Sequence, residues 1–200
     1  MAIAVFLCLA AGPAVSPAQE TPDPSRERLW SASVFYGIFS RKDLNQMARE
    51  LPTAEQARTR WMFAAAVSRE LWSWQEHFSL EIEGIGAKHY MKYHPRELEE
   101  IVLHFPLRVS GFPWDGYLRT TFAVGEGFSY CTKEPPNPDQ RYDTDPRFLN
   151  YLMLEASFGL PLAPQADLVL RIHHRSGIFG LMGPSKVGNN YYNFGLRINF

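Results

Sequence analysis

The last residues of the chain alternate between apolar and polar side chains. From residue 192 to the end, every second position holds a large apolar or aromatic side chain: Tyr192, Phe194, Leu196, Ile198 and Phe200. The positions between them are polar or small: Asn193, Gly195, Arg197 and Asn199. Successive side chains of a β-strand point to opposite faces, so this pattern predicts a strand with one apolar and one polar face.

Seven earlier segments show the same period of two and are separated by residues typical of turns. The eight predicted strands are Leu29–Ser40, Trp61–Leu71, Phe78–Ala87, Leu98–Val109, Tyr117–Tyr130, Phe148–Leu160, Asp167–Ser176 and Tyr191–Phe200. Residues 41–60 predict a long loop or a short helix, and Gly125-Glu126-Gly127 predicts a bulge or bend in the fifth strand. Eight segments of this length predict an all-β fold, an eight-stranded antiparallel up-and-down β-barrel with a narrow interior filled by side chains.

The alternation does not say which face of the barrel meets water. The polar face carries several charged side chains: Glu81, Glu83, Arg119, Glu155, Arg171 and Arg197. In a soluble, lipocalin-like barrel that binds an apolar ligand, these charges lie outside in water. In a transmembrane barrel they lie in the lumen and must be paired with one another, because an unpaired buried charge is costly.

Both ends of the chain favour the transmembrane alternative. Residues 2–11 form a short apolar segment, and Ser16-Pro17-Ala18 has small residues where a signal peptidase cuts. We therefore expect a signal peptide over residues 1–18, a flexible N-terminus over 19–28 and a barrel over 29–200; a buried N-terminal helix or strand is the alternative. The terminal Phe200 resembles the end of the closing strand of Gram-negative outer-membrane barrels, where the assembly machinery reads that aromatic residue. This resemblance implies a location in the cell outer membrane.

Composition agrees with this interpretation. The net charge is −1 with no long run of one sign, so we expect no nucleic acid partner. Mean hydropathy is −0.24 although 46% of residues are hydrophobic. Beyond the N-terminus no apolar run approaches the roughly 18–20 residues of a membrane helix, whereas barrel strands keep a low average hydropathy. Cys131 is the one cysteine that follows the predicted signal peptide, so no intramolecular disulfide is expected.

The seventh predicted strand carries residues that could perform chemistry. Leu168, Leu170, Ile172, His174 and Ser176 share its apolar face. Neighbours on one face of a strand are about 6.5–7 Å apart, so His174 can reach the Ser176 hydroxyl and activate it for attack on an ester. A third group must orient the imidazole. His173 has the opposite parity and is expected in the lumen beside a carboxylate. Because neighbouring strand residues point apart, we expect no metal site from His173 and His174, and we expect no cofactor.

The His-x-Ser motif, the Gly-containing loop after it and the final aromatic strand resemble the lipid A 3-O-deacylases of the PagL type, an acyloxyacyl hydrolase-like family of outer-membrane barrels. The resemblance covers Arg171–Phe200 and implies a Ser/His esterase that removes an ester-linked acyl chain from lipopolysaccharide. It also implies contact with outer-membrane lipids and with the barrel-assembly machinery. Both a monomer and a homodimer are compatible with the sequence.

The chain departs from this family at the third member of the triad. The family uses a Glu on the outward face near the start of the last strand, whereas no Glu or Asp occurs between Ser176 and Phe200. The outward positions here are Gly188 and Asn190, and Asn190 can orient an imidazole but cannot stabilise its cation by charge. We expect the catalytic residues Ser176, His174 and Asn190, with a catalytically inactive barrel of structural or lipid-contacting role as the alternative. Glu126 is expected to point into the barrel.

Overall fold

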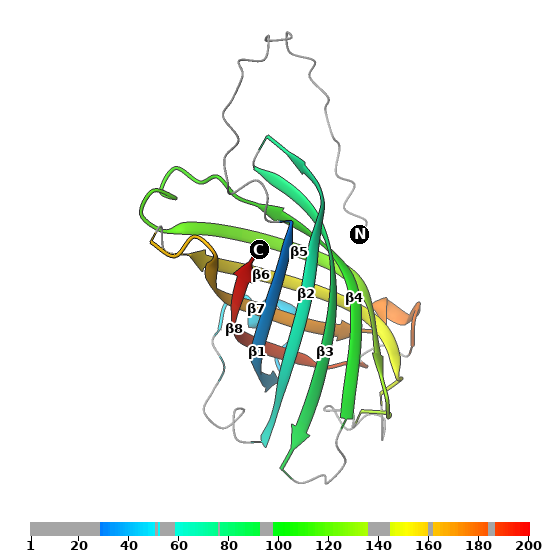
Figure 1. Ribbon diagram of the computed structural model, residues 1–200. Coiled ribbons are helices and arrows are strands. Elements are labelled where there is room, and N and C mark those ends of the chain that lie inside the picture. Colours follow the sequence, from blue (N-terminus) through cyan, green and yellow to red (C-terminus); the bar gives the residue numbers. More distant parts are fainter. Residues whose placement is uncertain are drawn as a thin grey trace.

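The computed structural model describes residues 29–50, 52, 59–75, 77–92, 98–135, 145–159, 162–183 and 187–200, which form a closed antiparallel barrel (Figure 1). Its elements are β1 (Trp30–Ser40), α1 (Leu44–Met47), β2 (Arg60–Trp74), β3 (Phe78–Met91), β4 (Leu98–Val109), β5 (Arg119–Cys131), β6 (Phe148–Gly159), β7 (Ala166–Ser176), η2 (Ile178–Gly180) and β8 (Asn190–Asn199). Each strand pairs with its neighbour in sequence, and β8 closes the barrel on β1. The eight-stranded up-and-down fold is therefore confirmed. The predicted signal peptide and residues 19–28 lie outside the described residues.

Most predicted strand positions are also confirmed, with differences at the ends. β2 and β3 run further than expected, to Trp74 and Met91, and form a long hairpin. β5 begins at Arg119 rather than Tyr117. The segment between β1 and β2 contains the short helix α1, whose N-cap Asp43 accepts a hydrogen bond from the backbone of Gln46. No helix among the described residues is long and apolar enough to cross a membrane.

The predicted bulge at Gly125–Gly127 is wrong. The β4–β5 and β5–β6 ladders continue through these residues without a shift, and the irregularity of register in the β2–β3 hairpin lies between Glu70 and Trp72. The two glycines instead make room inside the barrel. A Cβ on Gly125 would lie 2.6 Å from the His104 ring, and a Cβ on Gly127 would lie 2.2 Å from the carbonyl oxygen of Leu103.

We expect Gly127→Ala to destabilise the barrel by about 1–3 kcal/mol, because the new methyl group collides with the backbone of β4. Gly86→Ala is the matched control, since a Cβ at Gly86 meets no atom within 4 Å. Urea unfolding of the refolded protein, followed by tryptophan fluorescence, measures both. Equal midpoints for the two variants would contradict this explanation of the glycine.

The charged face of the strands lies inside the barrel. Glu155 lies at the centre of this interior, where it accepts hydrogen bonds from Arg108, Arg171 and Arg197. Further along the axis, Glu83 binds Arg171 and His104, and Glu100 binds His89 and His173. The predicted luminal position of His173, beside a carboxylate, is thus confirmed, as is the predicted pairing of the charges.

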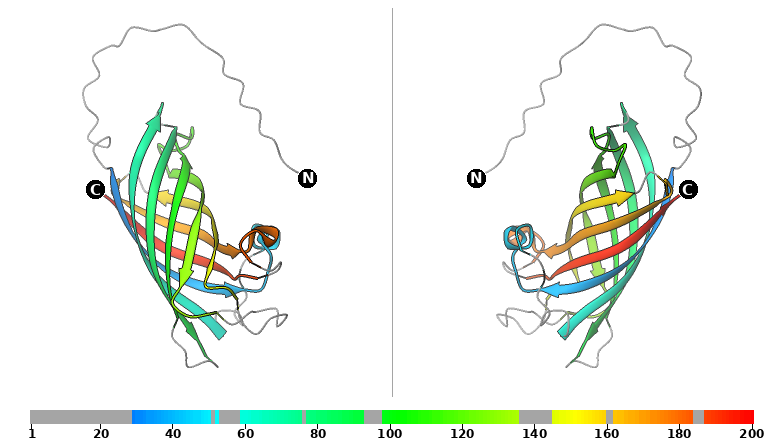
Figure 2. Two further views of the ribbon diagram at one scale, coloured as in Figure 1. Left: turned by 90° about the vertical axis from the view of Figure 1, so that its right-hand side faces the viewer. Right: turned by 90° about the vertical axis from the view of Figure 1, so that its left-hand side faces the viewer.

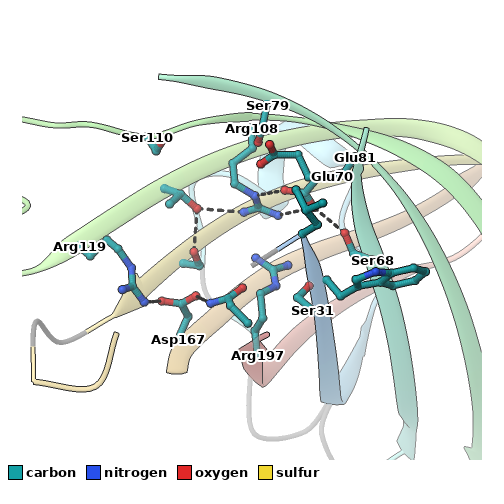
Figure 3. Close-up of a pocket in the computed structure, with 15 residues that line it drawn as sticks. Ser31, Ser68, Glu70, Ser79, Glu81, Arg108, Ser110, Arg119, Asp167 and Arg197 are labelled. Atoms are coloured by element: carbon teal, nitrogen blue, oxygen red, sulfur yellow. Dashed lines mark hydrogen bonds and ion pairs between the residues drawn. The ribbon is translucent and has the colours of Figure 1, made fainter. Parts of the chain in front are cut away.

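The interior opens near the start of β1 and the end of β8 into a polar cavity of about 210 Å³ (Figure 3). Its walls carry mutually paired groups, with Arg108 bound to Glu81 and Arg119 bound to Asp167. This end also has the connection between β2 and β3, whereas the longer segments 41–59 and 132–147 join strands at the other end. In outer-membrane barrels the short turns face the periplasm and the longer loops face the outside.

The outer wall is apolar. Its exposed side chains include Val34, Phe63, Val67, Ile101, Leu103, Phe105, Phe122, Val124, Leu168, Leu170 and Leu196. Trp30, Trp72, Trp74 and Trp114 lie exposed toward the end of the barrel that holds the polar cavity, as amphipathic anchors at a membrane interface do. An apolar exterior around a charged interior suits a bilayer, so the soluble, lipocalin-like alternative is wrong.

Candidate functional site

The structure places His174 and Ser176 on the outer wall at the end of β7. Their neighbours on the same face, Leu168 and Leu170, are exposed, while Arg171, His173 and Arg175 on the other face are buried inside the barrel. Both candidate residues are half-buried at the outer surface. The predicted parity is therefore correct, and the two polar side chains are set into a lipid-facing wall, where polar groups are costly and tend to be functional.

Asn190 is the direct ladder partner of His174. Its Oδ1 accepts a hydrogen bond from Nδ1 of His174 at 2.5 Å, and its Nδ2 donates to the carbonyl oxygen of Lys42 at 2.7 Å. The second bond fixes which end of the amide faces the imidazole, since only the amide nitrogen can donate to a carbonyl. Asn190 therefore keeps the proton on Nδ1 and leaves Nε2 with a free lone pair, the form that a general base requires.

Gly188 allows the chain just before β8 to pass close to the backbone of β7. Gly188 has φ of +120°, and a Cβ there would lie 1.9 Å from the carbonyl oxygen of Arg175. Next to it, the backbone nitrogen of Arg175 donates to the carbonyl oxygen of Asn189 at 3.0 Å. This close approach aligns Asn190 with His174. The sequence predicted that Gly188 faces outward. In the structure its role is to leave room for the backbone of Arg175, where a side chain would not fit.

Ser176 is not yet engaged with the imidazole. Within the described part of the chain its hydroxyl makes no hydrogen bond, to Nε2 of His174 or to any other group. Just after it, Ile178 has a left-handed backbone with φ of 44°. A β-branched residue rarely adopts this conformation, and such outliers concentrate at functional sites.

Two further polar side chains lie beside this group and were not predicted there. Asn150 of β6 is the ladder partner of Ser176, and its Nδ2 donates to Oε1 of Glu126 at 2.5 Å. The prediction that Glu126 points into the barrel is wrong: it shares the outward face of β5 with Val124 and Phe128. The alternation itself places Glu126 outside once the assumed bulge is removed.

A helix of the first long segment packs against the same part of the wall. Met47 of α1 is buried, and Nζ of Lys42 pairs with Glu50 at 2.8 Å. The hydroxyl of Tyr192 donates to the carbonyl oxygen of Glu50 at the end of this segment. Figure 2 shows α1 and η2 at the end of the barrel that lies away from the C-terminus. Among the described residues, no group of three or more His, Cys, Asp or Glu side chains could hold a metal ion.

Comparison with solved structures identifies the architecture. The outer membrane enzyme PagL matches with a TM-score of 0.56 at 10% identity, over 85% of this chain and 99% of PagL. The fold is that of the eight-stranded outer-membrane β-barrels. Neisserial surface protein A matches with a TM-score of 0.52 at 11% identity, over 86% of this chain and 96% of that protein.

The N-terminal β-barrel domain of Pseudomonas aeruginosa OprF matches with a TM-score of 0.50 at 11% identity, over 86% of this chain and 96% of that domain. No family model matches the sequence, and no curated protein does. Identities this low establish the fold alone. Together with the apolar wall and the charged lumen, this fold places the chain in the outer membrane.

Proposed function

We propose that this barrel is an esterase that removes an ester-linked acyl chain from lipid A, with Ser176 as nucleophile, His174 as general base and Asn190 as the group that orients the imidazole. The observation that carries the proposal is the His174–Asn190 hydrogen bond on the lipid-facing wall, two residues from a serine on the same face. The resemblance of Arg171–Phe200 to the PagL-type deacylases gives the substrate class.

An apolar groove beside these residues supports a substrate with an acyl chain. The groove has a volume of about 430 Å³ and lies on the outer wall of β5–β8, and Met47 and Ala48 also line it. Its lining includes the outward side chains Phe122, Leu154, Ala156, Leu170, Ile172 and Phe194. Ile172 is the neighbour of His174 on the outward face of β7 and lies further from the loop end of the barrel. The groove therefore leads from the site toward the middle of the bilayer.

The first half of the reaction follows from the orientation of the imidazole. Oγ of Ser176 attacks the ester carbonyl carbon while its proton passes to Nε2 of His174. The tetrahedral intermediate then collapses, the bond to the sugar oxygen breaks, and the imidazolium returns the proton to that oxygen. The acyl chain is left as an ester on Ser176.

Water completes the cycle. His174 takes a proton from the water as the water oxygen attacks the acyl-enzyme, and Ser176 regains its proton when the fatty acid leaves. Asn190 holds the ring through both halves by accepting from Nδ1, which keeps Nε2 directed at the reacting groups. This site lies at the loop end of the barrel, where a lipopolysaccharide in the outer leaflet presents its ester groups.

Expression in a Gram-negative host tests the proposal. We expect mass spectrometry of isolated lipid A to show the loss of one acyl chain, together with release of the matching free fatty acid. Heat-dependent mobility on a gel must show that the barrel is assembled. Unchanged lipid A in cells that contain the assembled barrel would favour the catalytically inactive alternative, whose support is the missing acidic residue on β8.

The groove gives a prediction about chain length. Ala156 is the ladder partner of Phe122 and Leu170, so Ala156→Phe should fill the groove. Excluding about two methylene groups of the acyl chain costs ~1.6 kcal/mol, so kcat/KM for a long-chain ester should fall roughly tenfold. Hydrolysis of a short-chain ester should not change. Ala65→Phe, on the exposed face of β2, is the matched control; an equal effect of the two substitutions would refute the assignment of the groove.

A further inference from the structure

Glu126 is a charged side chain on the lipid-facing wall that has no ion-pair partner among the described residues. It is exposed on the face of β5 that also carries Val124 and Phe128. Phe128 stacks on Phe148 with ring centroids 5.6 Å apart, and both rings lie closer than Glu126 to the loop end. Glu126 therefore lies on the membrane side of these aromatic rings. A carboxylate at this depth is energetically costly, and such residues generally mark functional sites.

The other outward charges of the described strands are compensated differently. Lys88 and Glu99 have opposite signs and are direct ladder partners, and the Arg69 guanidinium lies over the ring of Trp30. Glu126 forms no ion pair with any residue that the structure describes. Its hydrogen-bond partner is the Asn150 amide, which donates to Oε1 at 2.5 Å.

Asn150 and the strand register together place the Glu126 carboxylate on the side of β5 that faces Ser176 and His174. Glu126 pairs with Leu152, Leu152 pairs with His174, and His174 pairs with Asn190, so these residues form one row across β5–β8. Adjacent strands are about 4.8 Å apart, which puts the Glu126 backbone about 10 Å from that of His174. Asn150, in the next row, is the partner of Ser176. The hydrogen bond from Asn150 draws the carboxylate over β6, toward the serine and the imidazole.

We propose that Glu126 supplies, from β5, the negative charge that stabilises the His174 imidazolium during catalysis. This inference rests on the proposed function. Among the described residues, Glu126 is the charged group that interacts electrostatically with His174. Asn190 contributes direction but no charge, so the acid that the PagL-type family has on its last strand is replaced by two residues. Asn190 holds the ring, and Glu126 lowers the energy of its cation.

Glu126 acts through His174 and is a positioning residue rather than a catalytic one. Its charge matters only while His174 carries the serine proton, which is at the transition states on either side of the acyl-enzyme. Removal of the charge should therefore lower kcat and leave KM unchanged. A residue that merely supported the fold would lower the yield of assembled barrel instead.

The experiment compares purified, refolded full-length variants on a p-nitrophenyl ester and on lipid A in mixed micelles. We expect Glu126→Gln to lower kcat roughly 10- to 100-fold with KM within about twofold of the wild type. Glu126→Asp should recover part of the loss. Labelling of Ser176 by a fluorophosphonate, in which Oγ displaces fluoride and His174 takes the proton, should slow by a similar factor. Glu99→Gln is the matched control and should behave as the wild type.

A second variant guards against a defect in assembly. Glu126→Leu removes the charge and matches the surrounding wall, so it should assemble at least as well as the wild type and lose activity as Glu126→Gln does. Wild-type rates for both variants, with Ser176→Ala inactive, would overturn the role of Glu126 and leave the esterase standing. An inactive wild type, or an active Ser176→Ala, would overturn the proposed function itself and this inference with it.

Discussion

Ser176→Ala should abolish the shortening of lipid A and leave the barrel intact. The substitution removes the one atom that forms the acyl-enzyme, so we expect hydrolysis to fall by at least about 10³-fold, with lipid A from the variant strain equal in mass to that of cells without the protein. Ser176 makes no hydrogen bond within the described residues, so stability should change by less than about 0.5 kcal/mol. Mass spectrometry of lipid A and gel mobility of the barrel measure the two quantities.

Ser73→Ala is the matched control for this experiment. Ser73 lies exposed on β2, opposite Ser79 and away from the groove, so its loss should change neither lipid A nor assembly. His174→Ala should match Ser176→Ala, because without the imidazole nothing in the pair accepts the hydroxyl proton. Retained deacylation by assembled Ser176→Ala would show that another residue is the nucleophile.

Glu155→Gln should produce the largest loss of stability. Glu155 is fully buried in the lumen and accepts hydrogen bonds from Arg108, Arg171 and Arg197. After the substitution Arg108 keeps Glu81 and Arg171 keeps Glu83, but Arg197 loses its carboxylate partner at 2.8 Å. An uncompensated buried charge costs about 3–5 kcal/mol, which urea unfolding of the refolded barrel would register.

Two companion variants test whether the loss of stability comes from the unpaired Arg197 charge and from the burial of that charge. Adding Arg197→Met to Glu155→Gln removes the orphaned cation and should recover part of the loss. Glu50→Gln breaks the Lys42–Glu50 pair, whose carboxylate side chain is 58% exposed, and should cost less than about 1 kcal/mol. A Glu155→Gln barrel as stable as the wild type would mean that water or a shift of Arg197 compensates the lost charge.

The local pattern of the sequence predicted the strands, the fold class and the face on which each side chain lies. It did so because a strand repeats every two residues, so parity along one segment is enough to place His174 outside and His173 inside. The one failure of this reasoning was at Glu126, where the flanking glycines were taken for a bulge. Those glycines serve a neighbour on another strand, His104, and no local pattern shows that.

The sequence alone could not predict which side chains meet across neighbouring strands. The His174–Asn190 hydrogen bond needs the β7–β8 register, which depends on the close passage of Gly188 over Arg175. The Asn150–Glu126 hydrogen bond joins residues 24 positions apart, and the loop between their strands does not fix how the strands align. The length of that loop fits several alignments, and only packing inside the closed barrel selects one.

By itself, the sequence determined that this protein is a barrel of eight alternating strands, with a serine and a histidine on its apolar face. Closure of the barrel decided that this face is the exterior, that Asn190 holds the imidazole, and that Glu126 lies in the same row of the outer wall, two strands from His174. The physical reason is that alternation is a property of one strand, whereas register is a property of two. The interior charges fix the register, because they must be paired across strands once they are buried.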